Sequence, residues 1–90
     1  MNSKLRISGT GNVVVPAFLT LRQRGYCVRW EKAADGAQTW FAESAKTELI
    51  ADDVLTLLAL ASIAETRGDQ WRATDAEIEN FLADYETPVV

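Results

Sequence analysis

The sequence predicts an α+β fold of order β-α-β-β-β-α-α, in which a small antiparallel sheet is packed on one face by three helices. Residues 26–32 and 38–44 alternate in polarity on either side of Asp35-Gly36, a dipeptide typical of hairpin turns. The apolar run 54–64 and the amphipathic run 74–85 predict two helices near the C-terminus. With 90 residues and 48% apolar content, the chain is expected to form one domain over residues 1–86, with a flexible tail at 87–90.

A strand and a helix are expected before the hairpin. Residues 4–8 alternate between polar and apolar side chains, which predicts a first strand. A helix is predicted over about residues 16–24, because proline is well tolerated in a first helical turn. Gly25 then provides a stop signal.

The hairpin has a predicted register. If Asp35-Gly36 forms a two-residue turn, Trp30 lies opposite Phe41 and both side chains face the core. Trp40 is then on the reverse face of the sheet, near Arg29 and Glu31. A turn longer by one residue would reverse these faces. A third strand is expected at residues 47–51.

The run Val54–Ala64 contains only two polar residues, Thr56 and Ser62. A helix that is apolar on nearly all sides must be buried on most of its surface. Asp52 or Asp53 is expected to cap its start, and Gly68 to follow its end. The sheet and the last helix can cover two of its sides. Not all of Leu55, Ala59 and Leu60 can then be buried within one chain.

The last helix has the clearest local signature. Thr74-Asp75-Ala76-Glu77 matches a capping box, and apolar residues recur from Ile78 to Tyr85 at helical spacing. Its apolar stripe is expected to join the core. The complete predicted core is Leu21, Val28, Trp30, Phe41, Leu57, Leu58, Ala61, Ile78, Phe81 and Leu82.

The composition disfavours most enzyme chemistry. The chain has no histidine and only one cysteine, Cys27, so the usual zinc, haem and iron–sulfur ligand sets cannot be assembled in one chain. Gly9-Thr10-Gly11 lacks the further residues of a phosphate-binding loop. A site for Mg²⁺ or Ca²⁺ built from carboxylates alone is compatible with this composition. No motif indicates one, and we expect no catalytic, metal or cofactor site. The N-terminal residues lack the apolar stretch of a signal peptide, and no run is long enough for a membrane span, which predicts a cytoplasmic location.

Charge is unevenly distributed along the chain. Residues 1–42 carry a net charge of +4, whereas residues 43–90 carry −8. Such a split can arise from neighbouring elements within the fold or can mark a charged partner. The candidate binding residues are basic, aromatic, apolar and acidic side chains: Arg22, Arg24, Arg29, Lys32, Trp40, Leu55, Leu60, Asp75, Glu79 and Asp84.

These features favour a small, acidic, non-enzymatic protein that acts through protein–protein interactions. We expect it to form a homo-oligomer or to bind a different protein. One alternative is an inhibitor of a basic toxin, in the style of immunity proteins and antitoxins. Another is nucleic-acid binding through the basic hairpin face, since arginine beside exposed aromatic rings suits stacking on single strands. The low isoelectric point argues against nucleic acid, because a basic domain is the usual footprint.

Overall fold

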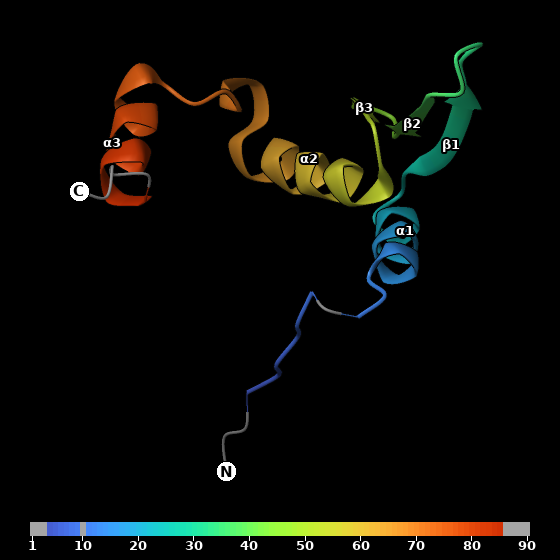
Figure 1. Cartoon of the computed structure of the whole chain (residues 1–90), viewed down its shortest axis with the longest axis horizontal. Coiled ribbons are helices and arrows are strands. Elements are labelled where there is room, and N and C mark those ends of the chain that lie inside the picture. The colour runs from blue at the N-terminus through green and yellow to red at the C-terminus, as the bar shows by residue number, and fades with distance from the viewer. Residues whose placement is uncertain (1–3, 10, 86–90) are drawn as a thin grey trace.

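The computed structural model describes residues 4–9 and 11–85 and confirms a small α+β fold (Figure 1). It contains an antiparallel sheet of order β1-β2-β3 and three α-helices. In chain order the elements are α1 (Val14–Gln23), β1 (Cys27–Lys32), β2 (Gln38–Glu43), β3 (Glu48–Ala51), α2 (Val54–Arg67), the short 3-10 helix η1 (Gly68–Gln70) and α3 (Asp75–Tyr85).

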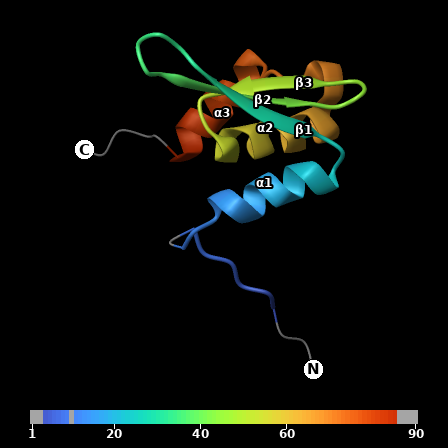
Figure 2. The same ribbon diagram turned by 90° about the vertical axis from the view of Figure 1, so that its right-hand side faces the viewer.

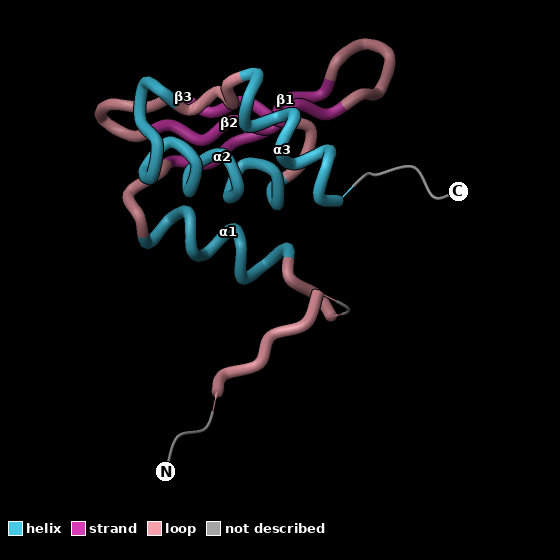
Figure 3. The backbone as a smooth tube through the Cα atoms, turned by 90° about the vertical axis from the view of Figure 1, so that its left-hand side faces the viewer, coloured by secondary structure: helices cyan, strands magenta, loops and turns pink. Residues whose placement is uncertain are grey.

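The predicted first strand is wrong. Within the described segment, residues 4–8 form no strand and lead away from the sheet, as Figures 1 and 3 both show. Leu5 and Ile7 are 87% and 77% exposed. Alternation gives a segment two faces, but a strand also needs a neighbouring edge that supplies hydrogen bonds. Here the segment precedes a helix that separates it from the sheet.

Helix α1 begins two residues earlier than expected. The Asn12 side chain accepts a hydrogen bond from the Val14 N–H at 3.1 Å, and Pro16 falls in the first turn. The chain leaves the helix through Gly25, whose φ of +93° favours glycine. Ala17 and Leu21 are buried on the inner side of α1.

The hairpin is where it was predicted, but its register is shifted by one residue. Trp30 pairs with Trp40, and Arg29 pairs with Phe41. The loop has three residues, because Ala33 N–H donates to the Ala37 carbonyl at 2.8 Å and Gly36 adopts a φ of +90°. The predicted Trp30–Phe41 pair is therefore wrong, and the two side chains lie on opposite faces of the sheet.

Both α1 and α2 lie on the same side of the sheet (Figure 2). The sheet contributes Tyr26, Ala42 and Leu49 to the buried core. Asp53 caps α2 by accepting a hydrogen bond from the Thr56 N–H at 2.7 Å, and Val54, Leu57 and Ala61 are its buried residues. This core holds α1, α2 and the sheet together.

The predicted core is correct in its centre and wrong at its margins. Leu21, Leu57 and Ala61 are buried as expected. A second group, Val28, Phe41 and Leu58, is only half-buried. The third group is exposed: Trp30, Ile78, Phe81 and Leu82.

Helix α3 stands apart from the rest of the described chain. In Figure 1 it lies at one end of the molecule, the sheet and α1 lie at the other, and α2 spans the distance between them. None of its residues is buried. The radius of gyration is 16.5 Å, compared with about 12 Å for a compact domain of this length.

Candidate interaction surfaces

Four large side chains form an exposed apolar band on α3, which we call the α3 stripe: Ile78, Phe81, Leu82 and Tyr85. Phe81 is 56% exposed and Tyr85 is 76% exposed. The rings of these two residues contact each other, with centroids 5.2 Å apart. By helical spacing the four side chains lie on one side of α3, so they form one exposed apolar surface.

The capping box at the start of α3 forms as the sequence predicts. The Thr74 hydroxyl accepts from the Glu77 N–H at 3.1 Å, and the Glu77 carboxylate accepts from the Thr74 N–H at 2.9 Å. The Thr74 hydrogen bond, together with the Arg67 guanidinium, lowers the pKa of Glu77. The cap stabilises α3 locally, so the helix does not depend on packing against the core for its first turn.

Arg67 connects α3 to the end of α2. Its guanidinium lies 2.9 Å from the Glu77 carboxylate, and it also donates to the carbonyl oxygens of Gln70 and Arg72 at 3.3 and 3.4 Å. These contacts set the path of the chain between the two helices. The α3 stripe is thereby held at a defined place on the outside of the molecule.

The polar sides of α3 are acidic. The helix carries four carboxylates and no basic residue. By helical spacing, Asp75 and Glu79 flank the stripe on one side, and Glu77 and Asp84 flank it on the other. The predicted acidic binding residues Asp75, Glu79 and Asp84 therefore border the apolar band on its two sides.

The predicted basic residues are divided among several surroundings. Arg24 lies 3.3 Å from the Glu65 carboxylate of α2 and donates to Ser62. Arg29 pairs with Glu31 on its own strand. Arg22 lies over the Phe18 ring at 5.7 Å.

The basic and aromatic side chains therefore do not form one surface. Lys32 is exposed at the end of β1. Trp40 lies on the helix-facing side of the sheet, packed against the core, and its ring centroid is 6.3 Å from that of Trp30. The expectation that it shares a face with Arg29 is wrong, because the hairpin register is shifted by one residue.

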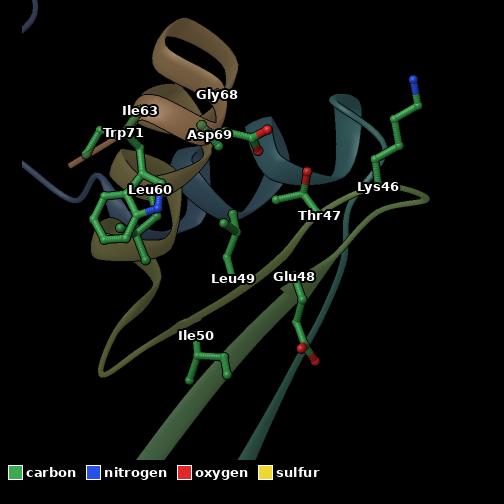
Figure 4. A pocket seen from close by; sticks show the side chains of 11 residues that line it. Lys46, Thr47, Glu48, Leu49, Ile50, Leu60, Ile63, Gly68, Asp69 and Trp71 are labelled. Carbon is green, nitrogen blue, oxygen red and sulfur yellow. The ribbon is translucent and has the colours of Figure 1, made fainter.

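The outer side of α2 is only partly covered. Leu55 and Ala59 are exposed, whereas Leu60 is half-buried. Leu60 and Ile63 line a groove of about 550 Å³ between β3 and α2, together with Leu49, Ile50 and Trp71 (Figure 4). We call this the β3–α2 groove. Its rim is mixed in charge, with Lys46, Glu48 and Asp69.

A second, shallower groove lies between α1 and the start of β1, and we call it the α1–β1 groove. It has a volume of about 450 Å³ and is lined by Phe18, Arg22, Gly25, Tyr26, Cys27 and Val28. Among these described lining residues there is one cation and no carboxylate. Sequence reasoning did not identify this groove. The sequence signal for it is the aromatic Phe18 one helical turn before Arg22, in a helix that precedes an edge strand.

Asp53 acts as the cap of α2. The Thr56 N–H bonded to the Asp53 carboxylate lowers the pKa of that group, as a helix cap should. Cys27 is exposed on β1, in a chain without histidine. Over residues 4–9 and 11–85, no cluster of carboxylate and cysteine ligands could hold a metal ion. Within the same residues, every helix is too short or too polar to span a bilayer.

Comparisons with protein-family models, curated proteins and solved structures find no match to this chain.

Proposed function

We propose that this protein is a non-enzymatic interaction protein that associates with itself through the α3 stripe. The observation that carries the proposal is the exposure of Ile78, Phe81, Leu82 and Tyr85 on a helix that has its own cap and, within the described part of the chain, no buried residue. Burying a large apolar side chain stabilises a complex by about 1.5–3 kcal/mol. A band of four such residues can therefore support a specific association.

The way in which α3 is held supports an interface. Arg67 and the capping box order the start of the helix before any partner binds. A partner that binds an ordered helix avoids part of the entropy cost of folding a disordered segment. Most soluble oligomers are symmetric assemblies of identical chains, so a second copy is the simplest partner.

Inhibition of a basic protein is a second candidate, favoured by the four carboxylates on α3. Complementary charge would accelerate its association with a basic target. It predicts that a copurifying basic protein is lost when Glu79 and Asp84 are replaced by lysine. Nucleic-acid binding has less support, because Arg24 and Arg29 are paired with carboxylates and Trp40 lies on another face.

The mass of the protein in solution tests self-association. We expect light scattering and sedimentation to report more than one chain per particle at micromolar concentration, and Phe81→Asp to restore the mass of one chain. Asn80→Asp is the matched control, since it adds the same charge to α3 on the side away from the stripe. A wild-type mass of one chain up to about 200 μM, above the dissociation constants of specific complexes, would remove the proposal.

A further inference from the structure

We propose that the α3 stripe of each copy docks in the α1–β1 groove of a second copy, which forms a dimer by reciprocal exchange of α3. This inference rests on the proposed self-association and names the surface that receives the helix. The occupant of the groove is a second copy of this chain.

The donor surface, which is the α3 stripe, and the acceptor surface, which is the α1–β1 groove, lie at opposite ends of one molecule. Helix α2 separates α3 from α1 and β1 (Figure 1), and the Arg67–Glu77 ion pair holds the junction between α2 and α3. A chain in this conformation cannot place its stripe in its own groove. The same separation leaves each end accessible to another copy.

The two surfaces complement each other in chemistry. Phe18 and Val28, which are half-buried, offer an aromatic ring and an aliphatic side chain to the stripe, and the buried Tyr26 lies beneath them as part of the groove lining. Arg22 provides a cation within the groove, and it is not among the arginines in the ion pairs described above. The carboxylates that flank the stripe supply the opposite charge, and such complementarity selects the partner and its orientation.

Charge also distinguishes this groove from the larger one. The β3–α2 groove carries Glu48 and Asp69 on its rim against the single cation Lys46. Docking an acidic helix there would bring carboxylates together at low separation, which is unfavourable. The α1–β1 groove imposes no such repulsion from its lining residues. The acidic helix is therefore assigned to the smaller groove.

Reciprocal exchange follows from having one donor and one acceptor per chain. Two copies related by a twofold axis satisfy both donors and both acceptors, so the assembly closes at two chains. One helix of eleven residues offers a small interface, and exchange doubles the buried area. A twofold arrangement therefore brings the buried area closer to the roughly 1,200–2,000 Å² that is typical of specific, stable protein–protein interfaces.

Disulfide trapping tests the assignment, because the only cysteine of the chain lies in the groove. We expect Leu82→Cys, on the stripe, to form an intermolecular disulfide with Cys27 under mild oxidation, identified by mass spectrometry of the linked peptides. Asn80→Cys, on the opposite side of the helix, is the matched control and should link much less. Equal linking by the two variants, or linking only between two native Cys27 residues, would overturn the proposed docking.

Charge reversal gives a second readout that does not depend on disulfide chemistry. Arg22→Glu should weaken dimerisation about tenfold at low salt, while Lys46→Glu, in the other groove, should change it by less than about twofold. The effect of Arg22→Glu should shrink as salt screens the charges. Circular dichroism would verify that both variants fold.

The outcomes separate the two proposals. A dimer that weakens equally with both variants, or only with Lys46→Glu, overturns docking in the α1–β1 groove and leaves self-association intact. Particles that grow continuously with concentration overturn the closed exchange, because an unreciprocated head-to-tail contact forms open chains. A wild-type chain that stays monomeric removes both proposals together.

Discussion

Replacing Phe81 by alanine distinguishes an interface residue from a core residue. The side chain is 56% exposed, and its ring contacts the ring of Tyr85 on the same helix. Alanine is also a better helix former than phenylalanine, by less than about 0.7 kcal/mol. We therefore expect Phe81→Ala to change the free energy of unfolding of the monomer by no more than about 0.5 kcal/mol.

The same change should have a large effect on association. A phenylalanine side chain can bury about 150–250 Å², so the exposed part offers roughly 100 Å² to a partner. At about 25 cal/mol per Å² this is about 2.5 kcal/mol, or nearly 70-fold in the dissociation constant, for each docked helix. A reciprocal dimer contains two such contacts, so Phe81→Ala should be monomeric at micromolar concentration.

Two measurements check this reasoning. Denaturant unfolding at submicromolar concentration reports the stability of the monomer, and sedimentation over a range of concentrations reports association. A loss of about 3–5 kcal/mol in the monomer would mean that Phe81 is a core residue, and would refute the position of α3. An unchanged dissociation constant would refute the role of the stripe.

Three further predictions concern the monomer. Leu57→Ala, at a fully buried position, should lower the free energy of unfolding by about 2–5 kcal/mol in denaturant titration; a loss below 1 kcal/mol would contradict the assigned core. Thr74→Ala should remove about 1 kcal/mol of cap stabilisation and lower the helical circular dichroism signal while Leu57 stays protected from hydrogen exchange; an unchanged signal would argue against the capping box. The pKa values of Asp53 and Glu77 are lowered in the folded chain, so their stabilisation is complete above the ordinary values of 3.8 and 4.5 and is lost as the pH falls through the lower folded ones. The melting temperature should therefore fall as the pH is lowered below about 4.5. If the melting temperature of Asp53→Asn falls with pH as steeply as that of the wild type, this linkage is refuted for Asp53.

Local sequence signals predicted the local structure well. Asp53, the apolar run and Gly68 identify α2 from its cap to its end, and the capping box identifies α3. These signals act within a few residues, and so they can be read without knowledge of the rest of the fold. The hairpin was located by Asp35-Gly36 for the same reason.

Signals that depend on distant partners were less informative. The extra residue in the hairpin loop reversed the faces of Trp40 and Phe41, and sequence alternation is compatible with either loop length. The stripe on α3 indicates that one side of the helix is apolar, but it does not say which surface covers that side. The α1–β1 groove is made by two elements and their packing, so no single segment encodes it.

The small size of the sheet has a consequence for solubility. Two of its three strands are edges, and an exposed edge is a template on which another chain can add a strand and begin an aggregate. Here β1 carries Arg29, Glu31 and Lys32 along its length, and β3 has only four residues and begins with Glu48. Charge and shortness both oppose the stacking of strands into cross-β fibrils. We therefore expect the sheets of different molecules not to join edge to edge.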